Sequence, residues 1–449
     1  MYKQLKSLGE SDLIRFCMPG HKGKNTGSIF DSVNKYDFTE IEPTDNLFAP
    51  EGIIKLSEEK AAELFKSKIS AYSACGATPL VKASLYLACK NKNVLAMRGS
   101  HMSFFDGAAL CRCKVEYLYP ELNGGVSMPP TPYEIEKKLE KKKFEALFIT
   151  SPNYYGVTAD IEGIAKACKK YGVILIVDNS HGAHLRFIDG GKNHPLALGA
   201  DLVIDSVHKT LPVLTGGAIL HSNADFTRAQ IKRAISLFAS TSPSYLVLNS
   251  IDCALEMCRQ NENLFDLAAK RVADFKIRLK NEGFFILESE PMRITLKLCQ
   301  NQLDAREINR QLLERYNIAC EMADRDNLVL IMSPFDSDED LEKLFNALCQ
   351  LKKEKIGKPK PLLRQIPCAQ ALMEPYQTLF AQTRETELKE AEGKICASHI
   401  NICPPCIPIV AAGELITKEI IDFITENTDI TTISIIEENC DNETYNGNS

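Results

Sequence analysis

The sequence predicts an α/β fold, in which helices cover both faces of a largely parallel sheet, followed by a smaller α+β domain. Two observations predict it. Up to about residue 221, short apolar and β-branched runs alternate with amphipathic segments of helical length, which is typical of consecutive βαβ units. Beyond residue 281, short strands and helices mix without that regular alternation, which is typical of an α+β domain.

The first 90 residues contain two predicted helices and a turn between them. Residues 1–45 are expected to form a polar, irregular lead. One helix is predicted over 57–65, with Ser57 as its N-cap, and the next over 80–89. The turn Cys75-Gly76-Ala77-Thr78-Pro79 lies between them. The free N–H groups at a helix N-terminus suit a phosphate, although many strand-to-helix turns share this composition.

The middle of the chain supplies the rest of the predicted sheet. Strands are expected at 94–97, 115–119, 146–152, 173–177, 202–204 and 217–221, and helices at 104–111 and 161–171. No G-x-G-x-x-G motif follows the first strand, so a dinucleotide-binding fold has little support.

Two of these strands are followed or ended by residues that could take part in catalysis. Asp178 ends the strand 173–177, and Lys209 follows the strand 202–204. A lone lysine is usually a solvated surface residue. A desolvated lysine, however, loses its proton and attacks a carbonyl to form a Schiff base. An aspartate for the pyridine nitrogen and a lysine for the aldehyde are the two groups that pyridoxal phosphate needs.

The second half of the chain is predicted to form the smaller domain. A break at 241–245 precedes a long helix over 246–281, with room for one interruption, and two short strands are expected within 284–298. Further elements are expected as helices at 303–316, 337–352, 386–392 and 417–427 and a strand at 328–332, with a linker near 353–362. The predicted domains are an N-terminal segment 1–45, a large domain 46–270 and a small domain 271–449.

Composition excludes several classes of protein. The formal net charge is −6 and no basic stretch stands out, which argues against nucleic-acid binding. No apolar run is long enough to span a bilayer, and no signal peptide is recognisable. The 16 cysteines are scattered, so we expect free thiols in a reducing cytoplasm and no metal site. The close pairs Cys111/Cys113 and Cys403/Cys406 are interpreted as structural.

Together these stretches resemble the Orn/Lys/Arg decarboxylase family, pyridoxal phosphate enzymes of the aspartate aminotransferase fold (fold type I). The likeness extends from Met18 to about Thr417 and implies a seven-stranded, mostly parallel sheet and the short form without an N-terminal wing domain. It is carried by Met18-Pro19-Gly20-His21-Lys22-Gly23, Asp45-Asn46-Leu47, Asp178-x-x-His181-Gly182-Ala183-His184, Ser206-x-His208-Lys209-Thr210-Leu211-Pro212 and Thr241-Ser242-Pro243-Ser244-Tyr245.

The resemblance implies roles for individual residues. Lys209 would form the internal aldimine and Asp178 would pair with the pyridine nitrogen. His101 would stack on the cofactor ring, and His181 would lie near the ring and its phenolic oxygen, with a histidine that merely caps the strand end as the alternative. The phosphate would be held by Gly76, Ala77, Thr78, Ser206 and His208. Acidic residues for a basic substrate would come from Glu40, Glu42, Asp45 and Glu51.

The implied activity is decarboxylation of arginine, lysine or ornithine in polyamine-type metabolism, by a homodimer or larger homo-oligomer with shared sites. Two alternatives stay open: another pyridoxal phosphate reaction, such as transamination or β-elimination, and a cofactor-binding protein without turnover. The chain departs from the family pattern at Ala77, where a serine is usual, and at Cys403-Pro404-Pro405-Cys406-Ile407-Pro408, where a tyrosine and a glycine are replaced.

Overall fold

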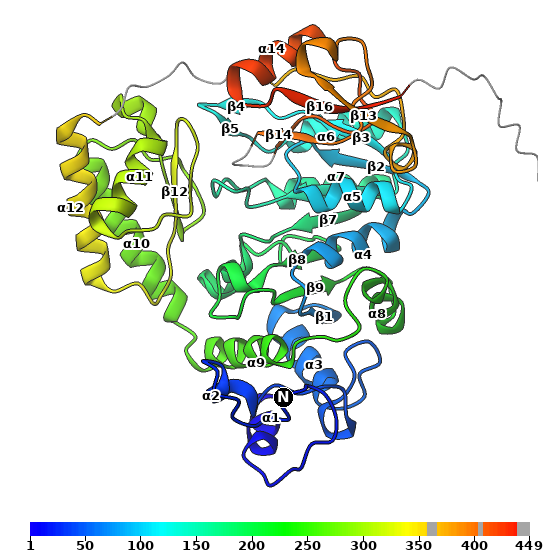
Figure 1. Cartoon of the computed structure of the whole chain (residues 1–449), viewed down its shortest axis with the longest axis vertical. Coiled ribbons are helices and arrows are strands. Elements are labelled where there is room, and N and C mark those ends of the chain that lie inside the picture. The colour runs from blue at the N-terminus through cyan, green and yellow to red at the C-terminus, as the bar shows by residue number, and fades with distance from the viewer. Residues whose placement is uncertain (357–365, 403–406, 438–449) are drawn as a thin grey trace, which may run out of the picture.

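The computed structural model describes residues 1–356, 366–402 and 407–437. At its centre is a seven-stranded sheet (Figure 1). The strand order is β1 (Ile69–Ser73), β9 (Ala218–Ser222), β8 (Leu202–Asp205), β7 (Ile174–Asp178), β6 (Ala146–Thr150), β2 (Asn93–Met97) and β3 (Lys114–Leu118). Only β9 runs against the others. The predicted mostly parallel, seven-stranded sheet is therefore confirmed.

Helices cover both faces of this sheet because its strands are apolar on both sides. In β7, Ile176 packs on one face and Leu175 and Val177 on the other, as the two-residue period of a strand requires. One face is covered by α4 (Thr78–Cys89), α5 (Met102–Leu110) and α8 (Arg228–Ser236). The other is covered by α3 (Ile53–Phe65), α6 (Pro132–Lys141), α7 (Ile161–Tyr171) and α9 (Tyr245–Gln260).

Two smaller units flank the large sheet (Figure 1). The first, here called the lobe, stands beside it and contains α10 (Leu264–Asn281), β10 (Arg293–Leu296), α11 (Ala305–Tyr316), β11 (Met322–Ala323), β12 (Leu328–Ile331) and α12 (Asp338–Glu354). The second, here called the cap, lies over the β3 end and contains α13 (Pro375–Thr378), β13 (Thr383–Glu387), β14 (Ile400–Ile402), β15 (Ile407–Val410), α14 (Lys418–Asn427) and β16 (Thr432–Ile436). The cap has its own apolar core.

Several predicted elements differ from the structure. The lead is partly regular, since α1 (Tyr2–Gly9) buries Leu5 and α2 spans Asp31–Asn34. Helix α3 starts at Ile53, and Ser57 is no N-cap but a buried residue inside it. The long helix is two helices, α9 and α10, separated at residues 261–263. Of the two strands expected within 284–298, one forms, β10, with an isolated bridge at Ile286.

The helix predicted over 386–392 is wrong. Residues up to Glu387 belong to β13, which pairs antiparallel with β16, and only Leu388–Glu390 form a single 3-10 turn. The strand partner lies almost fifty residues away in the sequence, so local propensity gave no sign of it. Most of the predicted linker and the turn at 403–406 lie outside the described residues. Among those that are described, no helix is long and apolar enough to cross a membrane.

Candidate active site

A cavity of about 350 Å³ opens at the carboxyl edge of the parallel strands. Such an edge is where open α/β sheets bind their ligands. All nine residues predicted to hold the cofactor line this one cavity: Gly76, Ala77, Thr78, His101, Asp178, His181, Ser206, His208 and Lys209. They follow four strands, β1, β2, β7 and β8, that are far apart in sequence but end at the same side of the sheet.

Asp178 is the last residue of β7 and is almost completely buried. Its Oδ1 accepts hydrogen bonds from the Ser180 hydroxyl at 2.5 Å and from the Ser180 backbone N–H at 3.1 Å. These two donors fix the orientation of the carboxylate toward the cavity that it lines. A buried, oriented carboxylate of this kind stabilises a cationic partner.

Lys209 stands next to His181 in the cavity. Strand β8 lies beside β7, and the short 3-10 turn Val207–Lys209 brings the Lys209 Nζ to 3.2 Å from the His181 Nε2. Burial lowers the pKa of Lys209, although Asp178 and Glu321 act in the opposite direction. Burial also lowers the pKa of His181 well below its usual value, and the positive charges of Lys209 and Arg293 lower it further. Burial thereby favours the neutral form of the His181 ring and weakens the preference of Lys209 for its charged form.

The N-terminus of α4 forms the end of the cavity that suits an anion. Ala77 is the N-cap, and no side chain caps this helix end within the described part of the chain. Gly76 adopts a φ of +76°, and its N–H donates to the carbonyl oxygen of Gly216. The predicted contact to a phosphate therefore falls on the N–H groups of Ala77 and Thr78 rather than on that of Gly76.

Two further histidines, His101 and His208, line the same cavity. His101 caps α5, because its Nδ1 accepts a hydrogen bond from the Ser103 N–H. Burial lowers the pKa of His101, which favours the neutral, flat ring. His208 donates from Nδ1 to the Gly217 carbonyl oxygen at 2.9 Å, so its Nε2 is left for a ligand.

The structure does not bring the predicted acidic residues to the cavity. Glu40, Asp45 and Glu51 are absent from its lining among the described residues. Asp45 instead accepts hydrogen bonds from the N–H groups of Glu51, Gly52 and Ile54 and so caps the start of α3. These N–H groups outweigh the effect of burial and lower the pKa of Asp45.

Four residues at the site carried no recognisable signal in the sequence. Tyr154 lines the cavity with its ring against His181, at 4.8 Å between ring centroids, and its hydroxyl donates to Glu321 at 2.5 Å. Arg293 donates to the His181 Nδ1 and lies against Glu290. Three of these residues, Glu290, Arg293 and Glu321, come from the lobe, where no local motif marks them.

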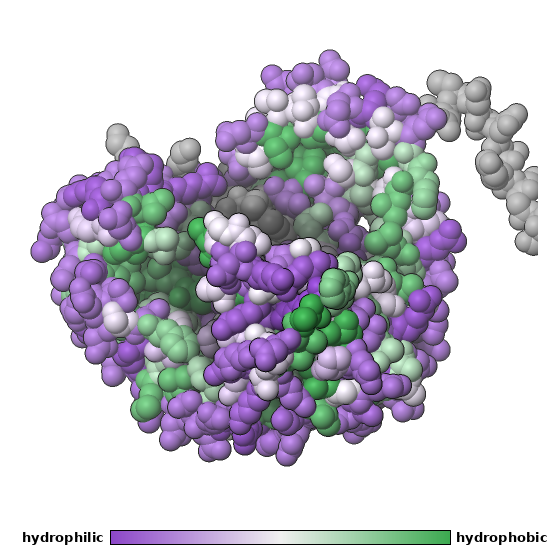
Figure 2. Space-filling model, turned by 60° about the horizontal axis from the view of Figure 1, so that its bottom comes forward, coloured by the Kyte–Doolittle hydropathy of each residue, from purple (hydrophilic) through white to green (hydrophobic). Residues whose placement is uncertain are grey.

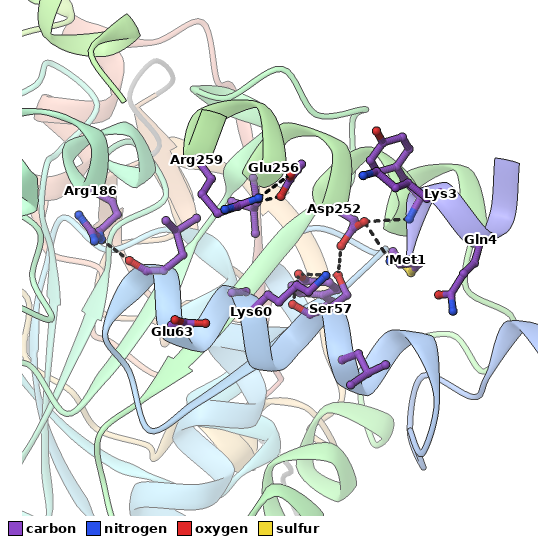
Figure 3. Close-up of a pocket in the computed structure, with 16 residues that line it drawn as sticks. Met1, Lys3, Gln4, Ser57, Lys60, Glu63, Arg186, Asp252, Glu256 and Arg259 are labelled. Carbon is purple, nitrogen blue, oxygen red and sulfur yellow. Dashed lines mark hydrogen bonds and ion pairs between the residues drawn. The ribbon is translucent and has the colours of Figure 1, made fainter. Parts of the chain in front are cut away.

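A larger hollow of about 870 Å³ lies elsewhere, between α1, α3 and α9 (Figure 3). Several of its polar side chains are paired with one another: Arg259 with Glu256, and Asp252 with Ser57. Arg186 donates to the Leu64 carbonyl oxygen. None of the predicted site residues lines this hollow, so its larger size does not make it the candidate active site.

Comparisons with known proteins agree with this geometry. The chain is 28% identical to the arginine decarboxylase of Bacillus subtilis (strain 168), over 96% of this chain and 93% of that protein. Its structure resembles the Francisella novicida lysine decarboxylase LdcF, with a TM-score of 0.83 at 19% identity, covering 97% of this chain and 80% of that one. It also resembles lysine decarboxylase A from Pseudomonas aeruginosa, with a TM-score of 0.84 at 16% identity, covering 97% and 80%.

The structural likenesses confirm the predicted fold type I. The family described as "Orn/Lys/Arg decarboxylase, major domain" matches residues 1–307, which include β1 to β10 and every residue of the cavity. This chain belongs to the Orn/Lys/Arg decarboxylase family.

Proposed function

We propose that this protein is a pyridoxal 5'-phosphate-dependent decarboxylase that converts a basic amino acid to its amine and carbon dioxide. One observation carries the proposal: a partly buried lysine, Lys209, lies with its Nζ 3.2 Å from the His181 Nε2 in a cavity that the Asp178 carboxylate also lines. Membership of the Orn/Lys/Arg decarboxylase family supports the reaction class.

The residues of the cavity fit this cofactor. It needs an amine for its aldehyde, a carboxylate for its pyridine nitrogen and donors for its phosphate. Lys209, Asp178 and the uncapped N-terminus of α4 supply these groups around a single cavity. When bound, the cofactor supplies an electron sink for the electron pair that the departing carboxylate leaves behind.

The chain's own groups provide attack, orientation and proton transfer. The neutral amine of Lys209 is the nucleophile. The hydrogen bond from the Ser180 hydroxyl holds the Asp178 carboxyl group in one orientation in the cavity. Lys209 or His181 is positioned to deliver the proton that replaces the carboxylate, because the two nitrogen atoms lie 3.2 Å apart within the cavity.

Glu321 supports a substrate with a cationic side chain. Its carboxylate lies at the exposed edge of the lobe and accepts the Tyr154 hydroxyl, whose ring lines the cavity. Burial lowers the pKa values of Lys209 and Arg293, and the negative charge of Glu321 partly opposes this lowering at both residues. We assign to Glu321 the role predicted for Glu40, Asp45 and Glu51, namely attraction of the distal amine or guanidine group of the substrate.

A homodimer or larger homo-oligomer is part of the proposal. Apolar side chains lie exposed on the N-terminal segment: Leu13, Ile14, Phe16, Met18, Ile29, Phe30 and Val33. Figure 2 turns this end of the molecule forward and shows hydrophobic areas among hydrophilic ones. Exposed apolar groups gathered in one segment are typical of a surface that another chain covers. Light scattering tests this, with a mass of at least two chains expected.

The activity is tested by supplying arginine, lysine and ornithine separately to the purified, cofactor-loaded protein. Amine and carbon dioxide should appear in equal amounts from at least one of them, and not with Lys209→Ala. A requirement for an added keto acid would point to transamination instead. Bound cofactor without any product from the three amino acids would point to a protein without turnover.

A further inference from the structure

Arg293 reaches from the lobe into the active site of the large domain. It is the first residue of β10 and is fully buried. Its side-chain stem runs against Gly156, where a Cβ would stand 2.6 Å from the Arg293 Cβ and Cγ. Gly156 also has a φ of +86°, so the loop after β6 leaves a passage that only glycine provides. The guanidinium ends 3.2 Å from the His181 Nδ1.

This contact determines where the proton of His181 lies. A guanidinium only donates hydrogen bonds, so the His181 Nδ1 must accept and carries no proton. The single proton of the neutral ring is then on Nε2, which faces the Lys209 Nζ at 3.2 Å. An N–H directed at Nζ needs a lone pair there, which an amine has and an ammonium lacks.

Glu290 holds Arg293 in place and connects it to the second histidine of the motif. The Glu290 Oε1 lies 3.5 Å from the Arg293 Nε, and its Oε2 lies 2.7 Å from the His184 Nε2. All three side chains are at most 1% exposed. Burial opposes ionisation of Glu290, but His184 and Arg293 outweigh it and lower its pKa. The pair therefore remains charged inside the protein.

We propose that Arg293, held by Glu290, is a positioning residue that fixes the proton of His181 on Nε2 and thereby keeps Lys209 as a free amine. Its guanidinium contacts His181 directly, and its positive charge also disfavours the ammonium form of Lys209. The inference rests on the proposed role of Lys209 as the nucleophile.

The contacts that connect these residues cross the boundary between the large domain and the lobe twice. One crossing is the His184–Glu290 contact and the other is the Arg293–His181 contact. His184, His181 and Lys209 belong to the large domain, whereas Glu290 and Arg293 belong to the lobe. The nucleophile is consequently prepared only while the lobe is docked against the loop after β7. This also explains why the motif Asp178-x-x-His181-Gly182-Ala183-His184 contains two histidines, since each faces one member of the same ion pair.

The test is the titration of Lys209 in the cofactor-free protein. Acetylation by limiting acetic anhydride, quantified on the Lys209 peptide by mass spectrometry across pH, reports the fraction of free amine. Arg293→Met removes the donor and the charge, so the pKa of Lys209 should rise by about one unit, which leaves about tenfold less free amine at neutral pH. Asp178 and Glu321 still face Lys209 in the variant, and His101 and His184 still face His181, so their effects cancel in the comparison.

The matched control is Arg271→Met. Arg271 is a partly buried arginine of α10 that donates to the Asp336 carbonyl oxygen and has no contact with the site. It should lower the thermal unfolding temperature and leave the Lys209 titration unchanged. If Arg293→Met does not fold, Glu290→Gln takes its place and should move the titration in the same direction by a smaller amount. An unchanged Lys209 titration in a folded Arg293→Met or Glu290→Gln variant overturns the proposal.

This result is independent of the proposed reaction, since no cofactor or substrate is present. A protein that shows the shift but releases no amine would keep the positioning role and lose the decarboxylase assignment.

Discussion

Arg98 and Arg293 are two fully buried arginines, and each joins the large domain to a flanking unit. They differ in how completely their guanidinium groups are hydrogen-bonded. Arg98 follows β2 and meets the cap, where its guanidinium bonds both Glu414 oxygens at 2.6 and 2.7 Å and the carbonyl oxygens of Pro408 and Ile409. Burial works against its charge, but Glu414 outweighs it and raises the pKa of Arg98.

Arg293 is much less well satisfied. Its Nε and Nη1 make no hydrogen bond within the described residues, and its carboxylate partner is 3.5 Å away. Burial lowers the pKa of Arg293. A buried charge with unmade hydrogen bonds is costly, and such groups concentrate at functional sites. Burial alone therefore does not distinguish Arg98 from Arg293, whereas the completeness of their hydrogen bonding does.

The largest effect on stability is expected at Arg98. Arg98→Met leaves the Glu414 carboxylate buried without its partner, and breaking such a pair costs about 3–5 kcal/mol. Denaturant unfolding should show this loss, and the titration of Lys209 in the folded fraction should stay as in the wild type. A shift of that titration by Arg98→Met would break the distinction between the two arginines.

A smaller effect is expected at Glu321, the acid that the lobe contributes. Glu321→Gln removes a charge near the cavity, so the KM for the preferred basic amino acid should rise about tenfold, equivalent to about 1.4 kcal/mol. The ratio of affinities for lysine and for norleucine, its uncharged counterpart, should fall by a similar factor. Glu314→Gln, on an exposed face of α11, is the control and should change neither. An unchanged lysine-to-norleucine ratio in Glu321→Gln would contradict the role of the lobe in recognition.

The cap should also respond to pH at His399. Its Nδ1 accepts the Ala412 N–H, its ring lies 5.0 Å from that of Phe105, and burial lowers its pKa to about 4. Below pH of about 6.5, the unfolded chain takes up a proton that the folded protein refuses until about pH 4. Stability should therefore fall as the pH is lowered through this window.

The measurement is the free energy of unfolding between pH 7 and 4, for the wild type and for His399→Asn. The variant lacks the titrating ring, so its stability should fall less over the same range. Parallel curves for the two proteins would remove His399 as the cause.

The parts of the fold and site that the sequence predicted are those with local signals. Asp178 ends one apolar strand and Lys209 follows the neighbouring one, and parallel strands bring their carboxyl ends to one edge, so the sequence predicts that both residues lie at the same edge of the sheet. The true start of α3 has no local signal, because the residue that accepts its first N–H groups, Asp45, lies several residues before the helix. The strand at Thr386 is likewise not predictable locally, because its strand partner, Ile433, is remote in the sequence.

The site residues that come from the lobe were not predictable from the sequence for the same reason, because their partners are remote in the sequence. Arg293 and Glu290 acquire their roles only through contacts with residues more than a hundred positions away. Glu321 likewise meets Tyr154 across the boundary between the lobe and the large domain. No spacing of residues in the sequence indicates such contacts. The acidic run around Asp45 has a composition that suits a basic substrate, but Asp45 instead accepts N–H groups at the start of α3.

The most direct test of the whole account identifies the lysine that holds the cofactor. The protein is loaded with pyridoxal 5'-phosphate and treated with borohydride, which fixes a lysine–aldehyde Schiff base as a stable amine, and the modified peptide is identified by mass spectrometry. Lys232 is an internal control, because it is also buried but is paired with the Glu58 carboxylate. The cofactor is expected on Lys209 alone, with no labelling in Lys209→Ala. Labelling of Lys232 or another lysine, with Lys209 unmodified, would contradict it.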